Sequence, residues 1–187
     1  ALEEYEQAVS RGADILGVID EYFNNSDGDG DMFYPSFEGQ QRLWKGVMAG
    51  SNEKPDVVKV HGTSTPSGDA VELLSVVDAL GEEGYHVSAP KSQFGHMLGG
   101  AGSVEFITAL LMLKEQKVLP CLNSPNLNPE LETFQKNPDW TGPMKPLAAY
   151  RHLLPQESFS KPINSIVCLN YGFGGTNSAL KLSKYDK

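Results

Sequence analysis

Residues 57–69 read Val-Val-Lys-Val-His-Gly-Thr-Ser-Thr-Pro-Ser-Gly-Asp, and an apolar stretch from Val71 to Leu80 follows and ends at Gly81. Val57–Val60 has the β-branched composition of a short strand, whereas Val71–Leu80 repeats apolar residues with helical spacing. The loop between them bears His61. We therefore predict a strand, a loop and a helix, with the imidazole at the strand's carboxyl end, where open α/β sheets tend to hold ligands.

A second unit of the same kind follows. His86–Ala89 is predicted to be a strand, 91–102 a glycine-rich loop that includes His96, and Val104–Lys114 a helix. Glycines let the backbone approach a ligand closely and leave free N–H groups where a helix begins. The alternation predicts a layered α/β fold with two imidazoles in one pocket.

The remaining segments give weaker patterns. We expect a helix at 2–11, a strand at 15–23, a loop entering a helix at 35–49, and two strands at 164–170 and 178–183 that could close the sheet as a hairpin. The proline-rich stretch 123–161 reads as an irregular insertion. The whole chain, 1–187, is predicted to be one domain.

Composition excludes several classes of function. The 187 residues carry a formal net charge of −9, which argues against nucleic acid or an anionic membrane surface as a partner. No apolar run approaches the roughly 20 residues of a membrane span, and the acidic start does not resemble a signal peptide. Two cysteines without metal or redox spacing favour a reduced, cytoplasmic protein and no metal site.

The residue types around the two histidines favour proton and oxyanion chemistry. An imidazole donates a hydrogen bond to a developing enolate or moves a proton near neutral pH. Lys91 and Glu105 could pair across the second loop, in a structural or a catalytic role. The chain contains neither a Walker-type ending nor a complete G-x-G-x-x-G motif, so we do not expect a nucleotide.

Three motifs together resemble the C-terminal half of the elongating β-ketoacyl-acyl carrier protein synthases, which have a thiolase-like fold. They are His61-Gly-Thr-Ser-Thr-Pro-x-Gly-Asp69, Lys91-Ser-x-x-Gly-His-x-x-Gly-Gly-Ala-Gly-x-x-Glu105 and Gly172-Phe-Gly-Gly-Thr-Asn177. The N-terminal helix, Ser26-Asp-Gly and Pro35-Ser-Phe-Glu-Gly39 also resemble the family's midpoint, so the similarity covers nearly the whole chain. The Thr-Ser-Thr form is closer to bacterial synthases of type I.

The resemblance implies a role for each matching residue. His61 and His96 correspond to the histidines that stabilise the enolate formed when malonyl thioester loses CO2. Lys91 and Glu105 correspond to the charged pair that organises the second histidine's loop. Thr63 and Thr65 correspond to hydroxyls of the phosphopantetheine tunnel. In the last loop, Phe173 would supply an oxyanion N–H and a gating ring, with Gly172 and Gly174 in the same substrate-binding loop, while Tyr171 departs from the usual phenylalanine.

The family's nucleophilic cysteine has no counterpart here. Cys121, expected in a strand, and Cys168 both look like small core side chains, so covalent catalysis lacks its first step. The resemblance therefore implies an N-terminal half that bears the cysteine, acyl carrier protein as partner, a homodimer of the complete enzyme and no cofactor beyond the carrier's phosphopantetheine.

Four alternatives stay open. The chain could belong to another thiolase-fold enzyme, a malonyl decarboxylase or a non-catalytic partner subunit of the chain-length-factor type.

The fourth alternative is a calcium site, because residues 27–38 place carboxylates at positions 1, 3, 5 and 12 of a calcium-binding loop. However, Met32 stands where the sharp turn requires glycine, which favours a solvated acidic turn.

Overall fold

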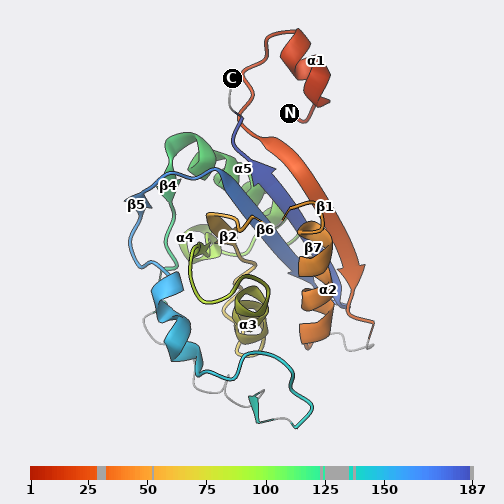
Figure 1. Cartoon of the computed structure of the whole chain (residues 1–187), viewed down its shortest axis with the longest axis vertical. Helices are drawn as coiled ribbons and strands as arrows, with labels where there is room; N and C mark the ends of the chain where they lie inside the picture. Colours follow the sequence, from red (N-terminus) through yellow and green to blue (C-terminus); the bar gives the residue numbers. More distant parts are fainter. Residues whose placement is uncertain (29–32, 52, 123, 125–134, 137, 186–187) are drawn as a thin grey trace.

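A mixed five-stranded sheet forms the centre of the computed structural model, which describes residues 1–28, 33–51, 53–122, 124, 135–136 and 138–185 (Figure 1). The strand order is β1-β7-β6-β2-β3. Their bounds are Val18–Ser26 for β1, Val57–Lys59 for β2, His86–Ser88 for β3, Ser165–Gly172 for β6 and Thr176–Ser183 for β7. The pairs β2–β3 and β2–β6 are parallel, whereas β6–β7 and β1–β7 are antiparallel.

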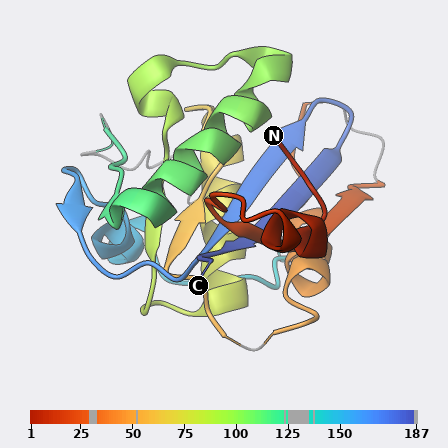
Figure 2. The ribbon, with the colours of Figure 1, turned by 90° about the horizontal axis from the view of Figure 1, so that it is seen from above.

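Helices cover both faces of the sheet (Figure 2). The longer helices are α2 (Phe37–Val47), α3 (Gly68–Leu80) and α5 (Ala101–Glu115); the shorter ones are α1 (Tyr5–Ser10), α4 (Lys91–Phe94), η1 (Leu98–Gly100) and η3 (Leu147–Leu153). A separate small sheet pairs β4 (Lys117–Val118) with β5 (Phe159–Ser160). The predicted layered α/β architecture is confirmed.

Two cores lie on opposite faces of the sheet because side chains alternate along each strand. In β6, Val167 and Leu169 join the core under α2 and α3. Ile166 and Cys168 point the other way and pack with residues of α5. By the same alternation, Lys59 of β2 lies on the face covered by α5.

Helix α5 is apolar around most of its circumference. Ala109, Met112 and Leu113 are buried against the sheet, yet Ile107 and Leu111 are 56% and 50% exposed. A helix that is apolar on all sides is typically buried on all sides. The outer face of α5 is therefore an uncovered apolar surface in this chain.

Several sequence-based expectations were wrong in detail. The final hairpin does not close the sheet, since β1 pairs along nearly the whole of β7 and takes the edge. The stretch 91–102 is not all loop, because it contains α4 and η1. Cys121 lies outside any strand. Within 123–161, the described residues form η3 and β5. None of the helices in the described part of the chain combines the length and apolar character of a membrane span.

Candidate functional site

The structure brings the two predicted histidines together in one cavity. His61 follows β2, and His96 lies between α4 and η1. Their ring centroids are 5.4 Å apart, with the ring planes nearly perpendicular at 86°. Both line a cavity of about 630 Å³ that also receives the glycine loop between β6 and β7. The two loops thus converge because β2 and β3 are adjacent parallel strands whose carboxyl ends meet at one edge.

Hydrogen-bond partners assign the tautomer of both rings. The Lys91 ammonium lies 3.3 Å from His61 Nδ1, and an ammonium has no acceptor, so Nδ1 must accept. The Leu98 backbone N–H donates to His96 Nδ1 at 3.3 Å. In neutral rings the proton is therefore on Nε2 of each. The cavity thus holds two imidazoles that can each donate from Nε2.

The surroundings of His61 keep its ring neutral. Burial lowers the pKa of His61 to about 3, and the positive charges of Lys91 and Lys59 act in the same direction. A hydrogen bond with the Asn170 side chain opposes this shift. A neutral imidazole donates to an oxyanion without first protonating the substrate.

We therefore expect the NMR signals of the His61 imidazole to show no titration between pH 5 and pH 8. The His61 pKa is about 3 in the folded protein and near 6.5 in the unfolded protein, so the unfolded state binds a proton more readily. The contribution of His61 to the free energy of unfolding is therefore complete above pH 6.5 and is lost as the pH falls towards 3. The same ring in urea-unfolded protein is the control and should titrate near pH 6.5. A midpoint near 6.5 in the folded protein would contradict the assignment.

Lys91 reaches His61 from a buried charge cluster. Its ammonium donates to the His61 carbonyl oxygen at 2.6 Å and forms an ion pair with Glu105, which confirms the predicted pairing. The other carboxylate oxygen of Glu105 binds the Lys59 ammonium at 2.6 Å. Glu105 is completely buried and does not line the cavity. It therefore acts on the site only through the two lysines.

The backbone of the first histidine loop is fixed by two carboxylates of α3. Glu72 accepts the N–H groups of His61 at 2.6 Å and Gly62 at 2.9 Å. Asp69 accepts the N–H of Ser64, a residue with a positive φ of 63°. Burial raises the pKa of Glu72 to about 7, although the two N–H groups act to lower it. These bonds hold the turn that points His61 into the cavity.

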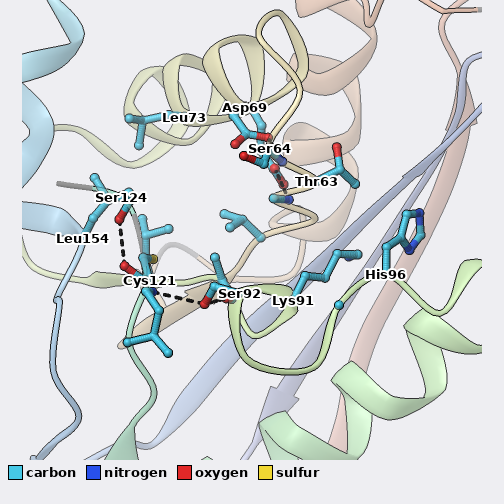
Figure 3. Close-up of a pocket in the computed structure, with 17 residues that line it drawn as sticks. Thr63, Ser64, Asp69, Leu73, Lys91, Ser92, His96, Cys121, Ser124 and Leu154 are labelled. Carbon is cyan, nitrogen blue, oxygen red and sulfur yellow. Dashed lines mark hydrogen bonds between the residues drawn. The ribbon is translucent and has the colours of Figure 1, made fainter. Parts of the chain in front are cut away.

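The two threonines of the same loop face the cavity from one side. The hydroxyl oxygens of Thr63 and Thr65 are 3.4 Å apart, and both residues line the larger cavity. A second cavity of about 420 Å³ is also lined by residues of this loop, among them Thr63 and Ser64 (Figure 3). Thr63, Asp69, Glu72 and His96 line both cavities, whereas Cys121, Ser124 and Leu154 line only the second. The first four residues therefore stand between the two spaces.

The glycine loop forms the opposite wall of the larger cavity. Gly172 and Phe173 line it, but Gly174 does not. The Phe173 ring is 81% exposed and meets Phe33 edge to face at 5.7 Å. Tyr171 occupies the position, two residues before Phe173, where the resemblance leads us to expect phenylalanine. The centroid of its ring lies 5.9 Å from that of the His61 imidazole.

Asp27 anchors the glycine loop to the rest of the protein. Its carboxylate accepts the Asn177 amide at 2.6 Å and the Ser36 N–H at 3.1 Å, and its own N–H donates to Gly175. Asp27 is buried, so the prediction of a solvated turn was wrong at this position. Asp29 and Asp31 of the calcium hypothesis lie outside the described residues, and the described residues contain no group of three or more metal-ligating side chains.

Gly175 can be tested against its neighbour Gly174, because both have left-handed φ, of 73° and 79°. A Cβ at Gly175 would lie 2.9 Å from Asp27 Cβ, whereas one at Gly174 would meet nothing within 4 Å. We expect Gly174→Ala to cost about 1 kcal/mol of backbone strain, and Gly175→Ala to cost about 1–3 kcal/mol more through overpacking. Urea unfolding measures both, and equal losses would show that the Asp27 contact has no effect.

Neither cysteine is suited to be a nucleophile. Burial raises the pKa of the Cys121 thiol to about 12 and that of Cys168 to about 11. The Cys121 thiol donates to the Val87 carbonyl oxygen at 3.3 Å. Since the thiolate is the reactive form, both side chains act as core residues.

The sequence interpretation missed four contributors to the site: Lys59, Glu72, Asp27 and Asn170. A lysine inside a run of valines and a glutamate at the start of an apolar helix were available signals, because buried charges of this kind require partners. Asp27 lies in an acidic turn and Asn170 in a strand, and neither setting distinguishes a site residue from its neighbours.

Fold and cavity together define a layered α/β protein that presents two imidazoles to one pocket. Comparison with known proteins is more specific: the family model for the β-ketoacyl synthase C-terminal domain matches residues 16–125. The chain belongs to the β-ketoacyl synthase family, as its C-terminal domain, and the predicted thiolase-like fold is confirmed.

Individual relatives agree with this assignment. The chain is 34% identical over 185 residues to 3-oxoacyl-[acyl-carrier-protein] synthase 1 of Haemophilus influenzae, covering 99% of this chain and 41% of the relative. It is 35% identical over 183 residues to synthase 1 of Escherichia coli K12, covering 98% and 40%. A β-ketoacyl synthase structure from Burkholderia phymatum superposes with a TM-score of 0.82 at 28% identity, covering 98% and 41%. The chain thus spans about two fifths of the length of these relatives.

Proposed function

We propose that this chain is the enolate-binding half of a β-ketoacyl-[acyl carrier protein] synthase that extends acyl chains by decarboxylative condensation. The observation that carries the proposal is the pair of imidazoles, His61 and His96, which line one cavity with ring centroids 5.4 Å apart. Preorganised donors aimed at developing negative charge often contribute more to such catalysis than any other single effect.

The chemistry assigns a task to each histidine. When the malonyl thioester loses CO2, the electrons of the broken C–C bond pass to the thioester oxygen and form an enolate. Nε2–H groups of His61 and His96 donate to this oxygen. The enolate carbon then attacks an acyl-cysteine thioester and expels the thiolate, which takes up a proton. The acyl oxyanion would be held in part by the Phe173 N–H.

Features of the cavity and of the relatives support a carrier-bound substrate. Thr63 and Thr65 place two hydroxyls on its wall, where they can meet the amides of a phosphopantetheine arm. The relatives are named for acyl carrier protein, and one ketosynthase of the same fold is described in complex with its carrier protein. We infer acyl carrier protein as the partner and no further cofactor.

We propose that the cysteine is supplied by a preceding half of the same protein. The uncovered apolar face of α5, with Ile107 and Leu111, supports this because it offers surface for a second half to bury. Docking of the acidic carrier is also better suited to that half, since this chain has a net charge of −9. Two free, buried cysteines fit a reducing, cytoplasmic setting, and the homodimer implied by the resemblance remains a prediction.

The test uses the full-length protein with malonyl- and acyl-carrier protein. We expect release of CO2 together with a product two carbons longer, and no product from a variant without the predicted cysteine. CO2 release without condensation would favour a malonyl decarboxylase. The absence of both activities would favour a chain-length-factor-type subunit; one solved structure of the same fold, at 23% identity, is described as a ketosynthase/chain length factor.

A further inference from the structure

Lys59 is a completely buried charged side chain next to the site, and the proposed function assigns it no role. Its side chain is 0% exposed. The ammonium donates to Glu105 Oε2 at 2.6 Å and to the backbone carbonyl oxygen of Leu169 in β6. A buried lysine is costly unless its charge is matched, and this one stands two residues before His61.

Lys59, Lys91 and Glu105 together carry more positive than negative charge, and burial raises the pKa of Glu72, the carboxyl that interacts with both lysines, to about 7. Glu105 is the carboxylate shared by Lys59 and Lys91, so these three groups sum to +1. Lys91 in turn touches His61 at Nδ1 and at its carbonyl oxygen. A connected path therefore runs from the Leu169 carbonyl through Lys59, Glu105 and Lys91 to the imidazole.

We propose that Lys59 is a positioning residue for the decarboxylation step: its fixed ammonium holds Glu105 and Lys91 in place behind His61 and supplies the excess positive charge that favours an enolate in the cavity. This inference rests on the proposed function. The charge acts at short range within the buried interior, where electrostatic interactions are stronger than in solvent.

The geometry explains why a lysine can do this from β2. Side chains alternate along the strand, so Lys59 points to the face covered by α5, where Glu105 lies in the first turns of that helix. Pairing of β2 with β6 brings Lys59 beside Cys168 in register, and the Leu169 carbonyl is then within reach. The ammonium thus ties α5 to the centre of the sheet.

Two substitutions separate charge from hydrogen bonding. Lys59→Gln removes the charge but keeps an NH2 donor on a side chain one bond shorter, whereas Lys59→Met removes both the charge and the donor. Lys181→Met is the matched control, since Lys181 is a nearly buried lysine of β7 that lines neither cavity. All three are made in the full-length protein.

We expect Lys59→Gln and Lys59→Met to lower kcat for malonyl decarboxylation by about 10–100-fold with KM and acyl loading of the cysteine unchanged, and Lys181→Met to leave all three unchanged. A further measurement does not need activity. The nitrogen-15 chemical shift of His61 Nδ1 reports the hydrogen bond that this atom accepts from Lys91, and it should change in both variants because that bond weakens. Unchanged kcat and unchanged His61 shifts in a folded Lys59→Gln protein would overturn the proposal.

The two proposals fail in different ways. If the unmodified protein releases no CO2 from malonyl-carrier protein, the proposed function fails, and the His61 shifts alone decide the role of Lys59. If neither variant folds, the unmodified protein still gives an answer: its Lys59 nitrogen must appear as an ammonium, and a neutral amine at pH 7 would overturn the proposal.

Discussion

Replacement of His61 or His96 by alanine lowers the rate of malonyl decarboxylation by about 10²–10³-fold for each donor removed, while acyl transfer to the cysteine of the full-length protein is retained. The expected loss is large because both Nε2–H groups are preorganised by other contacts, Lys91 for His61 and the Leu98 N–H for His96. Loading is retained because it forms no enolate. Release of labelled CO2 and single-turnover acylation measure the two steps separately.

His152→Ala is the matched control for both variants. His152 lies in η3, bonded through Nε2 to the Glu82 carbonyl, and lines neither cavity. Its replacement should change neither step. Loss of acyl loading with normal decarboxylation in the His61 or His96 variant would show that the assigned roles are wrong.

Glu105→Gln should be the most destabilising single substitution of the buried charge cluster, at about 3–5 kcal/mol. The amide oxygen can accept from one ammonium, but the NH2 group then faces the other as donor against donor. Lys59 and Lys91 would both remain in the interior without a counter-charge. Equilibrium urea unfolding of the full-length protein measures the loss.

Glu82→Gln supplies the comparison, because Glu82 pairs with Lys145 at 2.6 Å while both side chains are about half exposed. Exposed pairs of this kind contribute about 0–1 kcal/mol, so this variant should unfold almost as the unmodified protein does. If the Glu105 variant also loses less than about 1 kcal/mol, the buried cluster does not organise the site as described.

Local patterns predicted the helices and strands well where the spacing of apolar residues agreed with the positions of turn-forming residues. The strand at Val57 and the helix that follows it were found because valines, a glycine loop and a helical apolar repeat occur in sequence. Prediction was poorer where partners are distant. The edge position of β1 depends on its pairing with β7, whose residues lie 150 or more positions later in the chain. Helix α4, four residues long, is too short for a periodic pattern to reveal.

The candidate site shows the same division. The residues that face the cavity, His61, His96, Thr63 and Thr65, lie in short glycine-rich motifs and could be named from the sequence. Of the residues that support them, Lys91 and Glu105 could be named from their motif, whereas Lys59, Glu72 and Asp27 could not. Lys59 and Glu105 are 46 positions apart, and Asp27 and Asn177 are 150 positions apart, so no local pattern connects them.

The sequence by itself identified the main groups that face the cavity, because a sharply bent loop needs glycine, proline and hydroxyl residues at fixed spacing. Only the tertiary structure decided their chemical state. His61 is held neutral with its proton on Nε2 by burial and by Lys91, and Lys91 is held by Glu105 and Lys59. Protonation depends on distances and on the exclusion of water, and both arise only when β2, β6 and α5 pack together.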